Sequence, residues 1–194
     1  MEYLKTLDTQ LFLFLNGLHN EFFDFIMFWL SNTFIWIPFY ALIIFLIIRH
    51  YKSDSVLILF FLIFAIVLCD QSASHFIKVL VERLRPSHEP SLAGLVHLSQ
   101  AGPGGLYGFV SSHAANVFGL AVFICLTLDK SFKILKYFLF IWAFIVSYSR
   151  IYNGVHYPGD VLGGAILGSF ISYLMYKLYL ISKITFSKNK NFIE

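Results

Sequence analysis

Residues 33–48 read TFIWIPFYALIIFLII, a nearly unbroken apolar run that ends at the polar residues Arg49, His50 and Lys52. A membrane helix needs about 20 residues to cross roughly 30 Å of hydrocarbon, so this run is close to the length of one span. Outward from it lie four more stretches of similar character: 56–77, 114–128, 134–146 and 161–181. The sequence therefore predicts an all-α protein, a polytopic membrane helix bundle with five spans.

The composition favours a membrane protein over the soluble classes. Of the 194 residues, 58% are hydrophobic, 19% are aromatic and only 13% are charged, and the mean hydropathy is +0.74. A soluble domain is usually nearer half apolar and a quarter charged. Disorder and a nucleic-acid-binding surface are excluded because charge is scarce. The length allows one domain, so we expect a single integral membrane domain over residues 1–194.

The N-terminal segment, residues 7–30, is apolar at close spacing but also contains Asn16, Glu21 and Asp24. An ionised carboxylate at the middle of a bilayer costs about 2.5–3.5 kcal/mol on insertion scales. We therefore expect an interfacial amphipathic helix or a broken span here. A full sixth crossing is the alternative.

Basic residues mark one face of the predicted bundle. With five spans, alternate connections share a face, and that face collects Arg49, Lys52, Lys130, Lys133, Lys136 and the lysines from Lys177 onward. Loops rich in lysine and arginine stay on the cytoplasmic side. The connections 87–112 and 149–159 are therefore expected on the non-cytoplasmic side.

Three polar clusters fall on that non-cytoplasmic side. In the first, Lys78 and Arg85 are seven residues apart and would share one helix face. In the second, GFVSSH at 108–113, a serine can cap the next helix, whose free N–H groups attract anions. His113 would lie at the rim of that anion site.

The third cluster is SRIYNGVHYPGD, residues 149–160. Pro158 suits the first position of the last helix, which places Asp160 in its first turn. Asp160 can accept a hydrogen bond from one ring nitrogen of His156 and leave the other nitrogen free as a nucleophile. Arg150 adds a cation at the end of the preceding span.

Together the clusters supply cations, two histidines, one carboxylate and a helix N-terminus, which suits phosphoryl transfer without a metal. A metal site is a weaker interpretation, since two histidines need a third ligand and the arginines repel a cation. A serine-protease triad of Ser112, His156 and Asp160 is a further alternative, although it leaves the cations unexplained. A non-enzymatic protein that binds or transports an anion or a lipid is the alternative from another class.

The clusters resemble the type 2 phosphatidic acid phosphatase (PAP2) family, which is related to the vanadium haloperoxidases. Its motif Lys, six residues, Arg-Pro is matched from Lys78 to Pro86. Its motif Ser-Arg, five residues, His, three residues, Asp is matched from Ser149 to Asp160. Its motif Pro-Ser-Gly-His is matched in part, since Val110 and Ser112 replace the proline and the glycine. The resemblance covers a core of residues 57–180.

The resemblance implies a site at the membrane surface in which His156 is the nucleophile and forms a phosphohistidine. Asp160 would orient His156, and His113 would protonate the leaving group. Neither a cofactor nor a metal is implied. The remaining motif residues would bind the phosphate: Lys78, Arg85, Ser111, Arg150 and Ser112 through its backbone N–H.

The sequence thus predicts an integral membrane phosphatase that hydrolyses a lipid phosphate or diphosphate on the non-cytoplasmic face. Undecaprenyl diphosphate is placed first, because recycling that carrier is a common role in the family. Phosphatidic acid, phosphatidylglycerophosphate and a lipid A phosphate are the alternatives. The short chain and compact loops favour a bacterial cytoplasmic membrane, with the site facing the periplasm or the exterior.

Overall fold

Helices make up the fold that the computed structural model describes, which covers residues 2–190, with side chains as far as residue 185. The ends of the expected domain, residues 1 and 191–194, lie outside that range. Within it there is no strand, and one isolated antiparallel bridge joins Leu84 to Tyr107. The α-helices are α1 Glu2–Asn16, α2 Glu21–Ser31, α3 Ile37–Tyr51, α4 Ser55–Gln71, α5 Lys78–Val81, α6 Ser112–Thr127, α7 Lys133–Tyr152 and α8 Pro158–Lys190.

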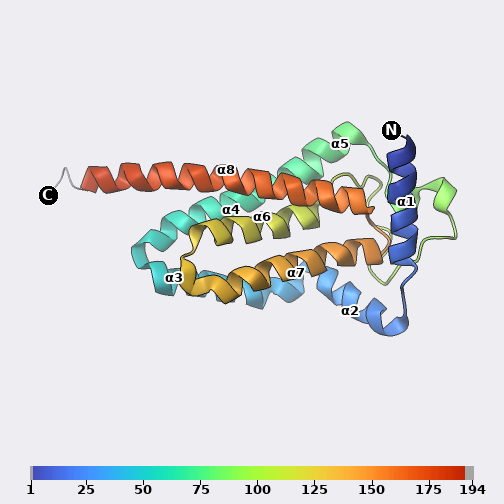
Figure 1. The fold of residues 1–194 in the computed structure, drawn as a ribbon, viewed down its shortest axis with the longest axis horizontal. Coiled ribbons are helices and arrows are strands. Elements are labelled where there is room, and N and C mark those ends of the chain that lie inside the picture. Colours follow the sequence, from blue (N-terminus) through green and yellow to red (C-terminus); the bar gives the residue numbers. More distant parts are fainter. Residues whose placement is uncertain (1, 191–194) are drawn as a thin grey trace.

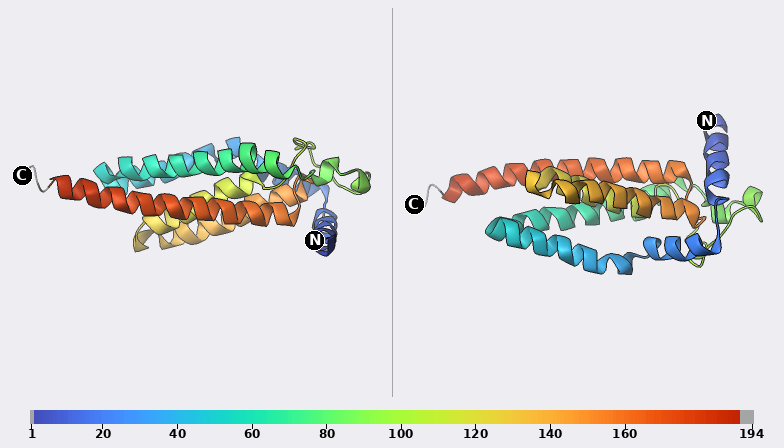
Figure 2. Two further views of the ribbon diagram at one scale, coloured as in Figure 1. Left: turned by 90° about the horizontal axis from the view of Figure 1, so that it is seen from above. Right: turned by 60° about the horizontal axis from the view of Figure 1, so that its bottom comes forward.

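Short turns connect these helices. The 3₁₀ turns are η1 Thr33–Trp36, η2 Lys52–Asp54, η4 Pro86–His88, η5 Pro90–Leu92 and η6 Lys130–Phe132, and η3 Ser72–Ile77 is π-helical. Five long helices (α3, α4, α6, α7 and α8) lie side by side, and α1 runs across one end of the bundle (Figure 1). The chain reverses at η2, so α3 and α4 form an antiparallel pair (Figure 2).

Three helical stretches are long and apolar enough to cross a membrane: Thr33–Val81, Lys130–Tyr152 and Pro158–Thr185. The helix Ser112–Thr127 is apolar but shorter. Because the first stretch folds back at η2, it contains both α3 and α4. The expectation of an all-α, membrane-type helix bundle is confirmed, while the number of five spans stays a prediction.

The N-terminal helices close one end of the bundle. Neither α1 nor α2 is among the stretches long and apolar enough to span a membrane. The buried side chain of Asn16 at the end of α1 donates to the carbonyl oxygen of Tyr152 at 2.8 Å and accepts from the backbone N–H of His97 at 2.8 Å. One amide therefore ties α1 to the end of α7 and to the loop before α6.

Small residues let α6 and α8 approach closely. A Cβ added at Gly164 or Gly168 of α8 would collide with the carbonyl oxygens of Ser111 and Ala115, respectively, in the first turns of α6. Glycine at such positions permits backbone contact between membrane helices. This contact brings the N-terminal ends of α6 and α8 together, and both ends carry motif residues.

Gly168→Val is expected to destabilise the protein, because its Cβ would overlap the rigid backbone of Ala115. Overpacking of this kind typically costs about 1–3 kcal/mol. Thermal unfolding in detergent should show a lower midpoint than the wild type. Gly105→Ala is the control, since a Cβ there meets nothing within 4 Å. An unchanged midpoint for Gly168→Val would contradict the close packing of α6 and α8.

Candidate active site

The three motifs meet at the end of the bundle that α1 covers (Figure 1). Lys78 Nζ donates to Ser112 Oγ at 3.2 Å, which joins the first motif to the second. The backbone N–H of Ser111 donates to the backbone oxygen of Asp160 at 2.9 Å, which joins the second motif to the third. Residues far apart in the sequence therefore form one cluster.

His156 and Asp160 form a buried pair where α8 begins. His156 Nδ1 lies 3.4 Å from Asp160 Oδ2, and the backbone N–H of Tyr157 donates to that same oxygen at 3.0 Å. The cations close enough to act on the imidazole are Arg150, Arg85 and Lys78. Burial and, after it, these positive charges hold the pKa of His156 well below its usual range. The ring is therefore neutral at pH 7, the form that has a nucleophilic lone pair.

Arg85 reaches the site from the loop that follows α5. Glu82 adopts a left-handed conformation (φ 50°), which ends α5 and redirects the chain. Arg85 Nε donates to the carbonyl oxygen of Tyr107 at 3.0 Å, so this nitrogen is anchored. Gly104 faces the guanidinium group, and a Cβ there would collide with Nη1. The chain thus holds Arg85 in place, with only 8% of the residue exposed.

Ser31, the last residue of α2, contacts two motif residues and was missed in the sequence. Arg150 Nη1 donates to its hydroxyl group. His113 Nε2 lies 3.2 Å from its carbonyl oxygen, which can only accept. Arg150 Nε is buried and has no acceptor within the described residues. Arg150 therefore has one buried N–H group that no described residue satisfies.

The second motif keeps a helix N-terminus despite its two replacements. Ser111 caps α6, since its side chain accepts from the backbone N–H of Ala114. Ser112 replaces the glycine, and its hydroxyl accepts the bond from Lys78. Val110, in place of the proline, is buried against α8. The free N–H groups of the first turn of α6 remain suited to an anion.

Arg83 is the clearest functional candidate that the sequence did not single out. Its Nη1 donates to Asp160 Oδ1 at 2.9 Å, and its Nη2 donates to Asp8 Oδ2 on α1 at 2.8 Å. The guanidinium group lies 4.1 Å from the centre of the Tyr157 ring. Asp8 Oδ1 also accepts from the backbone N–H of Gly159 at 2.8 Å. Arg83 therefore links α1 to the carboxylate that faces His156.

Clusters of metal-binding side chains are not part of this site. Across residues 2–190, no three His, Cys, Asp or Glu side chains gather closely enough to hold a metal ion. The side chains that converge are mostly cationic, and such groups attract an anion.

The sequence profile of the PAP2 superfamily matches residues 55–183, about two thirds of the chain. The chain belongs to the PAP2 superfamily. Its fold agrees, since the crystal structure of Aquifex aeolicus LpxE superposes with a TM-score of 0.63, covering 88% of this chain and 95% of that one at 24% identity. A transmembrane PAP2-type phosphatidylglycerolphosphate phosphatase from Bacillus subtilis gives 0.65 over 92% and 87% of the two chains at 23% identity.

Several named phosphatases are similar to this chain in sequence. A lipid A 4'-phosphatase of Bacteroides thetaiotaomicron is 41% identical over 95% of this PAP2 chain and 81% of its own length. A lipid A 4'-phosphatase of Porphyromonas gingivalis is 32% identical over 94% and 77%. An undecaprenyl-diphosphatase of Sulfolobus acidocaldarius is 35% identical over 74% and 63%. The expectation of an enzyme, a hydrolase of phosphate esters, is confirmed, and the chain is an integral membrane protein.

Arg83→Gln is expected to lower kcat for phosphate release by about 10- to 100-fold, because Asp160 loses a charged partner and His156 loses its alignment. A misplacement of 1 Å at a reacting group can cost about 100-fold. Steady-state kinetics on a lipid phosphomonoester checks this. Asp8→Asn is the matched control, since it leaves the bond between Arg83 and Asp160 in place and should have a smaller effect. An equal loss of kcat in the two variants would mean that Arg83 only holds α1 in place and does not position Asp160.

Proposed function

We propose that this PAP2 chain hydrolyses the 4'-phosphate of lipid A. The observation that carries this proposal is the 41% identity with the Bacteroides enzyme over 95% of the chain. The Porphyromonas enzyme supports the same substrate over nearly the same length. Undecaprenyl diphosphate, placed first from the sequence, is supported by a relative that matches a smaller share of the chain. The lipid A alternative is therefore the better supported of the two.

In the proposed reaction, His156 Nε2 attacks the phosphorus, since Nδ1 faces Asp160. The bond from phosphorus to the sugar oxygen breaks, and a phosphohistidine forms. His113, which is protonated on both ring nitrogens once the anionic substrate is bound, supplies one proton to the leaving oxygen and becomes neutral. Because the carbonyl oxygen of Ser31 holds the proton of Nε2, the nitrogen that exchanges the proton is Nδ1. Water then attacks the phosphohistidine, returns its proton to His113 and releases inorganic phosphate.

Cations stabilise the phosphoryl group in this scheme. Arg85, Arg150 and Lys78 all act on His156 and so lie near the point of attack. The free N–H groups at the start of α6, including that of Ser112, would bind the oxygens that carry developing charge. The unpaired Nε of Arg150 is a buried donor that a phosphate oxygen can satisfy. The charge of the site thus favours an anion before any substrate is considered.

The protease alternative is less consistent with the geometry. Ser112 Oγ accepts from Lys78 Nζ, and within the described residues no hydrogen bond links it to His156. A serine nucleophile needs its base within hydrogen-bond reach. A protein that only binds or transports the lipid would instead show lipid binding without phosphate release.

We also propose five crossings, formed by α3, α4, α6, α7 and α8 in one domain over residues 1–194 with its catalytic core at 57–180. The motifs lie at one end of the bundle, and the turns after α3 and α6, with their lysines, lie at the other (Figure 1). Positive loops favour the cytoplasm. In a bacterial cytoplasmic membrane the site would then face the periplasm or the exterior, with α1 in the interface.

Ser91→Cys is expected to react with an impermeant maleimide added to spheroplasts, whereas Lys133→Cys should react only after the membrane is permeabilised. Both side chains are exposed, so access depends on the membrane alone. The background is a variant in which Cys69 and Cys125 are replaced. Labelling of Lys133→Cys but not of Ser91→Cys in intact spheroplasts would reverse the orientation.

His156→Ala is expected to abolish phosphate release from lipid A, because the proposed nucleophile is gone. Wild-type release should survive EDTA and be blocked by vanadate. Rapid quenching with labelled lipid should trap a phosphoprotein in the wild type and none in His156→Ala. His75→Ala, which changes an exposed histidine of η3, is the control and should stay active. Turnover in His156→Ala would show that His156 is not the nucleophile. Faster phosphate release from undecaprenyl diphosphate than from lipid A would make undecaprenyl diphosphate the substrate.

A further inference from the structure

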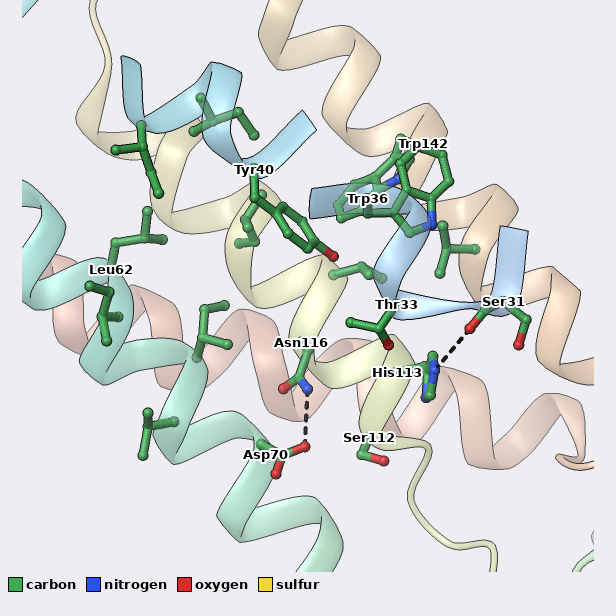
Figure 3. Close-up of a pocket in the computed structure, with 18 residues that line it drawn as sticks. Ser31, Thr33, Trp36, Tyr40, Leu62, Asp70, Ser112, His113, Asn116 and Trp142 are labelled. Atoms are coloured by element: carbon green, nitrogen blue, oxygen red, sulfur yellow. Dashed lines mark hydrogen bonds between the residues drawn. The ribbon is translucent and has the colours of Figure 1, made fainter. Parts of the chain in front are cut away.

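A cavity of about 480 Å³ lies between the helices of the bundle and reaches the second motif. Ser112 and His113 line its polar end, so it begins at two residues of the second motif. Its walls come from α3, α4, α6 and α7 and are mostly aliphatic and aromatic (Figure 3). A cavity of this character, continuous with a lipid phosphate site, fits the part of the lipid next to the phosphate.

Two polar side chains interrupt the apolar wall of this cavity. Asn116 Nδ2 on α6 donates to Asp70 Oδ1 on α4 at 3.1 Å (Figure 3). Asn116 Oδ1 is buried and has no donor within the described residues. A buried acceptor without a partner is costly. An aspartate within a membrane-spanning stretch is costly as well and indicates a function. The pair therefore offers acceptor oxygens to a ligand that brings donors.

The pair lies at the depth where the chains of a lipid begin. Asp70 lies near the end of α4 and is separated from Lys78, the first residue of α5, by the π-helical segment η3, so it lies further along the bundle from the phosphate site than Lys78 does. Asn116 follows His113 by three residues, about one turn further from the start of α6. A lipid whose phosphate contacts Lys78 and His113 would therefore place its linkage groups or first chain carbons beside Asp70 and Asn116.

We propose that Asp70 and Asn116 form a specificity site that binds an N–H or O–H donor of the lipid, such as an amide linkage or a hydroxyl group on an acyl chain. The inference rests on the proposed lipid phosphatase function. Ester-linked chains carry only acceptors there, so they leave Asn116 Oδ1 without a donor. A site built around a hydrogen bond strongly rejects an analogue that lacks the matching group. The enzyme therefore selects donor-bearing lipids over ester-only lipids.

A purely structural role explains only part of this pair. The bond between Asn116 and Asp70 ties α6 to α4, as polar pairs between membrane helices often do. That tie uses one N–H and one carboxylate oxygen. It gives no partner to Asn116 Oδ1, and this unpaired atom is the reason for proposing a ligand.

Two synthetic acylated hexose 4-phosphates of equal chain length test the proposal. The donor lipid has amide-linked 3-hydroxyacyl chains, and the ester lipid has ester-linked plain chains. For the wild type, kcat/KM should be at least about tenfold higher on the donor lipid, the worth of one hydrogen bond to a charged group. Asn116→Leu and Asp70→Asn should each bring the donor-to-ester ratio about tenfold closer to one. Val67→Leu, on the same cavity wall, should change both lipids alike and keep the ratio.

Other outcomes would overturn the proposal. Equal cleavage of the two lipids by the wild type, or no cleavage of the donor lipid, would remove the donor preference. If Asn116→Leu and Asp70→Asn lower both rates alike, the pair is a tie between helices and nothing more. These results leave the proposed phosphatase function standing, because that function is tested separately, by phosphate release from lipid A compared with undecaprenyl diphosphate.

Discussion

The buried carboxylate of Asp160 is the group on which the rest of the site depends. An ion taken out of water costs several kcal/mol unless it is well paired. The partners of Asp160 come from two segments. Arg83 lies in the loop after α5, and the N–H of Tyr157 and the ring of His156 lie where α8 begins. Arg83 is held in turn by Asp8 of α1. The pairing of Asp160 therefore needs both the loop after α5 and the start of α8, and α1 contacts the same arginine from the other side.

Among the described residues, the other cations of the site form no ion pair with a carboxylate. Asp160 contacts Arg83, whereas Lys78 donates to a hydroxyl, Arg85 to a carbonyl and Arg150 to a hydroxyl. Neutral acceptors compensate a buried cation only in part, and low dielectric strengthens its attraction for an anion. An excess of positive charge held rigidly where the three motifs meet thus favours an anion.

Spacing in the sequence could predict the helices and the motif residues, because a long apolar run and a fixed interval between polar residues are local signals. No such signal marks the residues that act through a partner on a distant segment, which are Arg83, Asp8, Ser31 and Asn16. Arg83 lies inside the first motif at a position that the motif does not specify, and Asp8 is 75 residues away from it. The course of α1 across the bundle end likewise depends on tertiary contacts at Asn16.

The phosphate site alone cannot choose among lipids, because every phosphomonoester presents the same oxygens to the same cations. Selection must come from groups that differ between lipids and that lie close enough to be held when the phosphate is bound. Under the proposed function the start of α6 is placed to meet both conditions: Ser112 and His113 belong to the second motif, and Asn116, one turn further along, lines the same cavity. In the proposed reaction, this one rigid helix would align both the phosphate and the part of the lipid that is selected, so a lipid that fits the cavity would also be held in position for attack.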